Sequence, residues 1–90
     1  MGQKFYYVYV LFSNKDKKFY VGYSQDLRAR IKDHLQGRVE STKNRRPIQL
    51  IHYEAFLDND DARSRERFLK SGFGRSQMKK AIQRTLAKLG

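Results

Sequence analysis

Two short runs of aromatic and β-branched residues, Phe5–Phe12 and Phe19–Tyr23, open the chain and enclose a polar stretch. Runs of this kind, bounded by Ser, Asn and Asp, are typical of strands, and two runs so close together predict a β-hairpin. A four-residue loop over Ser13–Asp16 would bring Tyr9 directly opposite Tyr20. Because opposed residues share a face of the sheet, the two phenols would then stand side by side.

Gly22 lies two residues after Tyr20 and therefore on the same face of the predicted hairpin. Glycine is a poor strand former and often marks a place where a ligand approaches the backbone closely. The tyrosine pair alone is explained by ordinary sheet packing. The space that Gly22 leaves beside Tyr20 favours a site on this face instead.

The next apolar residues recur every fourth position and predict a helix whose buried stripe is Leu27, Ile31 and Leu35. Ser24 or Asp26 can cap its start, and Gly37 suits its end. Arg30 and His34 flank the stripe. Each residue alone has an ordinary explanation, because an arginine stem can cover apolar residues and a histidine can be half-buried. Together, an arginine and a histidine that both lean inward are less ordinary and favour a functional site.

The segment 38–47 predicts a loop with Ser41 and Thr42 as extra donors, and it carries four basic side chains: Arg38, Lys43, Arg45 and Arg46. A phosphate-contacting loop and an ordinary solvated loop are both open interpretations. A third strand is predicted over Ile48–Phe56, with Ile48 and Leu50 on one face and Ile51, Tyr53 and Ala55 on the other. Apolar residues on both faces predict helices on both sides of the sheet.

A second helix is predicted from a cap at Asp58 or Asn59 to about Ser71-Gly72, with an apolar stripe of Ala62, Glu66, Leu69 and Phe73. Glu66 is the only acidic residue from Ala62 to Gly90, among nine Lys and Arg. It is either a salt-bridge partner for Arg63, Arg65 or Arg67, or a metal ligand. Ser76 can cap a last helix with Met78, Ile82, Leu86 and Leu89 on one face.

The composition adds a strong positive charge, with 20 Lys and Arg against 9 Asp and Glu, a net +11. A small domain this basic is first interpreted as a nucleic-acid binder. We expect a single domain over residues 1–90, with a motif-bearing core at about 5–75 and a basic helix over 76–89. The lack of cysteine excludes disulfides and cysteine-based zinc sites, and it fits the cytoplasm. The longest apolar run, Phe5–Phe12, is too short to span a membrane.

The unusual residues on this basic chain fit metal-assisted hydrolysis of a phosphodiester. A single carboxylate, Glu66, suits one Mg²⁺ held mostly by water and phosphate. Arg30 suits a phosphate that develops charge. A tyrosine hydroxyl or the His34 imidazole could take a proton from water, although a tyrosine pKa near 10 would first have to be lowered by neighbouring positive charge or a metal.

With these residues in view, the chain resembles the GIY-YIG nuclease superfamily, specifically its small stand-alone bacterial branch with a URI-type domain. The two motifs appear as Tyr7-Val8-Tyr9 and Tyr20-Val21-Gly22, with eleven residues between the motif tyrosines. The segments SQDLRARIKDH, STKNRRP and RERFLKSGFGR are also similar to family segments. The resemblance covers residues 5–75.

The resemblance implies an α+β fold, a three-stranded antiparallel sheet with about three helices. It also implies a metal-dependent DNA endonuclease, with structure-specific cleavage and a repair role as the finer hypothesis. Its catalytic residues would be Tyr9, Tyr20, Arg30 and His34, with Gly22 as the motif glycine. Glu66 would hold one divalent cation, Mg²⁺ or alternatively Mn²⁺. The nucleic-acid-binding residues would be Arg38, Lys43, Arg45, Arg46 and Arg75.

The chain departs from the family pattern in two places, of which the first is common in this branch and only the second, a missing asparagine, puts efficient cleavage in doubt. Tyr7 replaces the first glycine of the first motif, and no asparagine follows Asn59, although many family nucleases have one after the metal glutamate. A non-catalytic nucleic-acid-binding module on the same scaffold is therefore the alternative, and an interaction domain of a larger complex is a third possibility. In each case we expect a monomer with no membrane contact and no organic cofactor.

Overall fold

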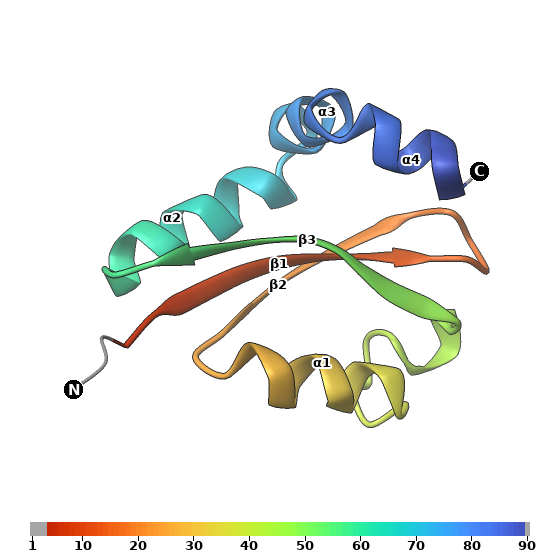
Figure 1. The fold of residues 1–90 in the computed structure, drawn as a ribbon, viewed down its shortest axis with the longest axis horizontal. Helices are drawn as coiled ribbons and strands as arrows, with labels where there is room; N and C mark the ends of the chain where they lie inside the picture. The colour runs from red at the N-terminus through yellow and green to blue at the C-terminus, as the bar shows by residue number, and fades with distance from the viewer. Residues whose placement is uncertain (1–3, 90) are drawn as a thin grey trace.

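The computed structural model describes residues 4–89. Its three strands, β1 (Tyr6–Ser13), β2 (Phe19–Ser24) and β3 (Ile48–Phe56), form an antiparallel sheet in the order β2-β1-β3. Helix α1 (Leu27–Leu35) lies on one face, and α2 (Asn59–Lys70), α3 (Gly72–Ala81) and α4 (Gln83–Leu89) lie on the other (Figure 1). The predicted α+β fold is confirmed, with four α-helices over the described residues where about three were expected.

The hairpin of β1 and β2 is confirmed, but its predicted register is wrong. Tyr9 pairs with Gly22, and Tyr20 pairs with Leu11. The two tyrosines share a face of the sheet, as predicted, but they are diagonal neighbours and do not stand directly opposite each other. The space beside Gly22 is therefore filled by Tyr9 and not by Tyr20.

The register differs because the four-residue loop is shifted by one position, to Asn14–Lys17. The Ser13 N–H donates to the Lys18 carbonyl at 3.0 Å and extends the ladder by one pair. The Ser13 hydroxyl also accepts the backbone N–H groups of Lys15 and Asp16, both at 3.2 Å. Lys17 adopts the left-handed conformation, with φ 61°. The serine thus acts as the last strand residue and holds the turn with its side chain, a role that strand propensity does not reveal.

Strand β3 has the predicted bounds, but a bulge changes which residues share a face. Val10 pairs with His52 while Leu11 pairs with Leu50, so Ile51 is an extra residue. Beyond the bulge, Tyr53 pairs with Tyr9 and therefore faces the same side as Leu50. The prediction that Ile51 and Tyr53 share a face is wrong, because strict alternation does not survive an inserted residue.

Helix α1 begins after Asp26, whose carboxylate accepts the Ala29 N–H at 3.1 Å. Gly37 follows its end with φ 77°, a conformation that suits glycine. Leu27 and Ile31 pack beneath the sheet against a small core of Tyr9, Leu11 and Ile48. Leu35 is 50% exposed and does not complete the predicted stripe.

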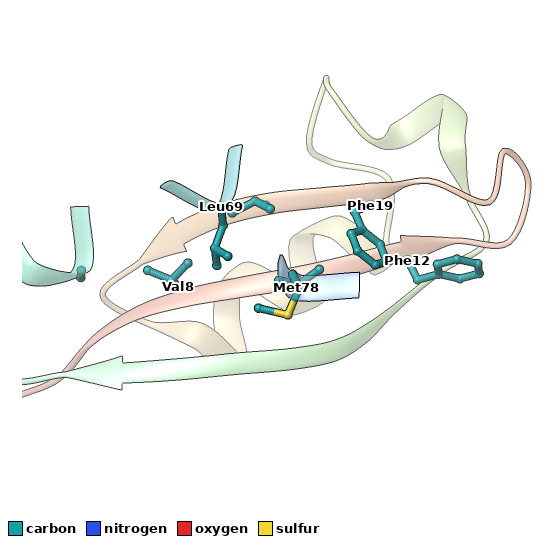
Figure 2. Close-up of a cluster of buried hydrophobic side chains, with 8 residues drawn as sticks. Val8, Phe12, Phe19, Leu69 and Met78 are labelled. Carbon is teal, nitrogen blue, oxygen red and sulfur yellow. The ribbon is translucent and has the colours of Figure 1, made fainter. Parts of the chain in front are cut away.

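The larger core lies between the other face of the sheet and helices α2 and α3. Figure 2 shows Val8, Phe12 and Phe19 from the strands meeting Leu69 of α2 and Met78 of α3. All five side chains are buried. The prediction that helices cover both sides of the sheet is confirmed.

The C-terminal helices differ from the prediction at their boundary. Asp58 caps α2 as predicted, but the next helix begins at Gly72 and not after Ser76. Ser71 caps it by accepting the Gly74 N–H at 3.0 Å. A Cβ on Gly74 would lie 1.8 Å from the Phe68 carbonyl oxygen, so only glycine permits this tight junction.

Two further differences concern the same C-terminal helices. Phe73 belongs to α3, is 67% exposed and is not part of the α2 stripe. The basic helix predicted over 76–89 is interrupted at Ile82, which separates α3 from α4. The apolar face is still formed, since Met78, Ile82, Leu86 and Leu89 all pack on the larger core.

The segment between α1 and β3 is a packed loop that contains a short 3₁₀ helix, η1 (Lys43–Arg45). Val39 and Thr42 are buried in it. The loop is joined to the hairpin turn because the Ser13 hydroxyl donates to the Arg45 carbonyl at 2.6 Å and the Lys15 ammonium donates to the Asn44 carbonyl at 3.0 Å.

Candidate active site

Three buried side chains from three different segments form a continuous chain of hydrogen bonds. The Tyr9 hydroxyl on β1 lies 2.8 Å from Nε2 of His34 on α1. Nδ1 of His34 lies 2.7 Å from the Thr42 hydroxyl in the loop after α1. Tyr9 is 1% exposed, and His34 and Thr42 are fully buried. Each polar atom of the imidazole therefore has a partner, and the ring orientation is fixed from both sides.

Gly22 makes room for this arrangement on the neighbouring strand. A Cβ at Gly22 would lie 2.3 Å from both Cζ and the hydroxyl oxygen of Tyr9. Any larger residue would therefore push the phenol out of its place. The expected function of Gly22 as a space-giving residue fits the structure, with Tyr9 as the side chain that uses the space.

Tyr20 completes an aromatic wall around the imidazole. Its ring centroid lies 5.3 Å from that of His34, and the Tyr9 centroid lies 5.5 Å from it. Both rings meet the imidazole in tilted, edge-on arrangements. Tyr20 is half-buried, so its phenol is more accessible than that of Tyr9. The structure brings both motif tyrosines and His34 together.

Burial shifts the pKa values of the hydrogen-bonded pair in opposite directions. It raises the pKa of Tyr9 to about 12, against a lowering effect of Arg30, while Tyr20 and Glu66 add to the rise. Burial also lowers the pKa of His34 to about 4, and Arg30 lowers it further against a small opposing effect of Asp33. At neutral pH the site therefore contains a neutral phenol and a neutral imidazole.

Arg30 lies in the same neighbourhood, one helical turn before His34. Its positive charge lowers the pKa of both Tyr9 and His34. The side chain is half-buried. An arginine at this position places positive charge next to the Tyr9 hydroxyl, where a phosphate could be bound.

Glu66 lies on α2, on the opposite side of the sheet from α1, and its charge makes the smallest of the contributions to the raised pKa of Tyr9. Its side chain is only 14% exposed, and its oxygens lie 2.9 Å from the Lys70 ammonium and 3.4 Å from an Arg63 nitrogen. Of the three expected salt-bridge partners, only Arg63 is used. Arg65 instead forms two bonds with Glu54 at 2.9 and 3.2 Å, which help to lower the pKa of that carboxyl against the effect of burial.

The side chains of the candidate site fit a divalent cation only if one carboxylate is enough to hold it. Within residues 4–89 no group of three His, Asp or Glu side chains is placed to hold a metal ion. Mg²⁺, however, is commonly held by one carboxylate with waters and substrate phosphates as the other ligands. Glu66 meets that requirement if Arg63 and Lys70, whose side chains are each 49% exposed, turn away toward solvent or phosphate.

The basic residues expected at nucleic acid are more engaged within the fold than the sequence indicates. Ion pairs join Arg38 to Asp33, Lys43 to Glu40 and Arg45 to Asp16, each at 2.9 Å. The Arg45–Asp16 pair lowers the pKa of that carboxyl against its desolvation.

Two of these basic residues converge on one strand. Arg45 and Arg75 both donate to the Phe19 carbonyl, at 3.3 and 3.4 Å, and both line a groove with Lys17 and Lys79. Arg46 is exposed, and its Nε donates to the Lys43 carbonyl at 3.1 Å.

Thr42 is the residue that sequence reasoning placed incorrectly. The sequence predicts it as an extra donor in a loop that either contacts phosphate or is solvated, whereas the structure buries it against His34. The only sequence signal is its position in a loop that follows the histidine, and this signal does not define a contact.

The comparisons with known proteins agree with the fold. Residues 5–81 match the GIY-YIG catalytic domain family. A UPF0213 protein of Staphylococcus haemolyticus is 38% identical over 79 residues, which cover 87% of this chain and 94% of that protein. A UPF0213 protein of Haloquadratum walsbyi is 37% identical over 68 residues, 74% of this chain and 75% of that protein. The solution structure of a UPF0213 protein from Bacillus halodurans has a TM-score of 0.52 and 34% identity, covering 82% of this chain and 81% of that one.

Proposed function

Because the chain belongs to the GIY-YIG family, a family of nucleases, we propose that it is a metal-dependent endonuclease that hydrolyses phosphodiester bonds in DNA. The observation that carries the proposal is the buried hydrogen bond between the Tyr9 hydroxyl and His34. It gives the phenol a proton acceptor, in a site whose electrostatics also include Arg30 and Glu66. The finer proposal, cleavage of branched DNA during repair, is tested by the choice of substrates below.

The proposed chemistry assigns one task to each residue. Arg30 binds the scissile phosphate and neutralises the charge that develops on it. A phenol with a pKa of about 12 is ionised in about one molecule in 10⁵ at pH 7. Tyr9 therefore works as a neutral hydroxyl that accepts a proton from water while its own proton moves to Nε2 of His34. Thr42 keeps the imidazole in the orientation that can accept it.

Glu66 is the residue that would hold the cation. When bound, a divalent cation supplies positive charge next to the phosphate and the attacking water. Tyr20, the more accessible of the two motif tyrosines, packs against His34 and would orient substrate or water. Within the described residues no helix is long and apolar enough to cross a membrane, and the strongly positive chain suits a polyanionic substrate.

A non-catalytic nucleic-acid-binding module is the second candidate, and one observation favours it. The Glu66 carboxylate is already paired with Arg63 and Lys70, and both cations oppose the binding of a metal ion. The chain also lacks an asparagine after Asn59, where many related nucleases have one. In this case the fold and the charge would serve binding alone.

Glu66→Gln distinguishes the two candidates, because it keeps the shape of the side chain and removes its charge. Cleavage of duplex, flap, forked and single-stranded DNA is measured with Mg²⁺ and with Mn²⁺. We expect the rate to fall by orders of magnitude while DNA binding and thermal stability change little. Glu40→Gln is the matched control, because Glu40 also pairs with a lysine but its side chain is 85% exposed on the surface. It should cut like the wild type.

Two results would contradict the proposal. If Glu66→Gln melts at a lower temperature but cuts normally, Glu66 is only a salt-bridge partner. If the wild-type protein binds DNA and never cuts it with either metal, the binding module is the correct function. Tyr20→Phe gives a second check, because it removes one accessible hydroxyl and should slow cleavage without reducing stability.

A further inference from the structure

A row of aromatic rings lies on the α1 side of the sheet, away from the candidate active site. Phe5 immediately precedes β1, and Tyr7 is the second residue of that strand. Tyr53 lies on the neighbouring strand β3. Phe5 is 38% exposed and Tyr53 is 53% exposed. Figure 1 shows that the N-terminal end of β1 extends beyond the start of α1, while Tyr7 and Tyr53 border a groove next to α1.

The rings contact one another without covering one another. Ring centroids are 6.4 Å apart for Phe5 and Tyr7, and 6.3 Å apart for Tyr7 and Tyr53. The interplanar angles are 46° and 58°, so the rings are tilted and not stacked face to face. Tyr53 is tilted against Tyr7 and still has about half of its surface open to solvent.

Positive charge borders the row. A groove of about 670 Å³ runs between α1 and β3, and Tyr7, Tyr53, Arg28 and Lys32 line it. Neither Arg28 nor Lys32 forms an ion pair within residues 4–89. The only carboxylate in the lining is Asp26, which is engaged in capping α1.

We propose that this aromatic row is a binding surface for unpaired bases of a single-stranded nucleic acid, with Tyr53 as the main stacking residue and Arg28 and Lys32 as phosphate contacts. Exposed rings on a rigid sheet, bordered by cations without acidic partners, are the combination that binds single strands with little sequence preference. A base pair inside a duplex presents no face to such a ring, so the surface selects single-stranded segments.

The aromatic row adjoins the candidate active site but is formed by different residues. Tyr53 pairs with Tyr9 across the sheet, while Arg28 and Arg30 lie on the two flanks of α1. A strand held on the aromatic row would therefore extend from a substrate bound at the active site. The inference rests on the proposed nucleic-acid substrate and adds that part of this substrate is unpaired.

The test is fluorescence anisotropy with a labelled oligothymidylate, in the presence of EDTA so that no cleavage occurs. We expect Tyr53→Ala to weaken binding by about tenfold, within the range of about 5- to 150-fold that loss of one stacked base produces. Tyr53→Phe keeps the ring and should bind like the wild type. Phe73→Ala is the matched control, because Phe73 is 67% exposed but lies on α3, on the opposite side of the sheet.

An oligothymidylate with abasic sites separates stacking from charge. It keeps every phosphate and lacks bases, so wild type and Tyr53→Ala should bind it equally. An equal loss on the normal and abasic strands would overturn the inference. So would unchanged binding by Tyr53→Ala, or a wild-type dimer that Tyr53→Ala dissociates, since the surface would then join two copies of the chain.

The outcome is independent of the test of the proposed function. A protein that never cuts DNA but shows ring-dependent binding would leave this inference standing and remove the nuclease proposal. If the protein cuts DNA and binds single strands equally well without the Tyr53 ring, the nuclease proposal stands and this inference is removed.

Discussion

The buried imidazole of His34 makes the stability of the fold depend on pH in a defined direction. Its pKa is about 4 in the folded protein and 6.5 in an unperturbed histidine. Between these values the unfolded chain binds a proton that the folded chain does not, so the contribution of His34 is complete above about pH 6.5 and is lost as the pH falls toward 4. From the two pKa values, the loss between pH 7 and pH 5 is about 2 kcal/mol.

His34→Gln isolates this contribution. A glutamine retains a donor and an acceptor for Tyr9 and Thr42 but does not titrate. The free energy of unfolding is measured by urea titration of both proteins at pH 7 and pH 5. The carboxyls of Asp16 and Glu54 have lowered pKa values and also destabilise the fold on acidification, but they are present in both proteins and cancel. The advantage of the wild type over the variant should shrink by about 2 kcal/mol. An equal loss of stability in both proteins would refute the conclusion that burial keeps His34 neutral.

Other substitutions test the packing and the charged loop. Gly22→Ala places a methyl group 2.3 Å from the Tyr9 ring, so we expect a loss of about 1–3 kcal/mol in thermal melts. Gly72→Ala, with no atom within 4 Å of its new Cβ, should be neutral or stabilising, and an equal loss at both positions would contradict the steric argument. Arg45→Ala combined with Arg46→Ala should flatten the slope of log affinity for DNA against log salt. An unchanged slope would remove the loop from the binding surface.

Features determined by neighbouring residues could be predicted from the sequence. The three strands follow from aromatic and β-branched runs, and the α1 and α2 caps follow from Asp26 and Asp58, whose carboxylates accept nearby N–H groups. The positions of Arg30 and His34 on one flank of α1 follow from helical spacing. These predictions need no knowledge of distant contacts.

The predictions that failed depend on single residues with unusual local structure. Ser13 moves the hairpin loop by one position through its side chain. Ile51 is an extra residue in β3, and Gly74 permits a junction that begins α3 four residues early. Thr42 contacts His34 only because the whole loop folds back under α1. No periodicity encodes such contacts, because they are selected by packing across the molecule.

The attachment of the loop to the hairpin turn has a dynamic consequence. Ser13 and Lys15 hold the carbonyl groups of Arg45 and Asn44, and Thr42 in the same loop orients His34. The turn and the loop should therefore open together as one cooperative unit in amide hydrogen exchange. Each opening would release the imidazole from its partner. A substitution at Ser13, which lies between the two motifs and belongs to neither, would then change how often the histidine is in place.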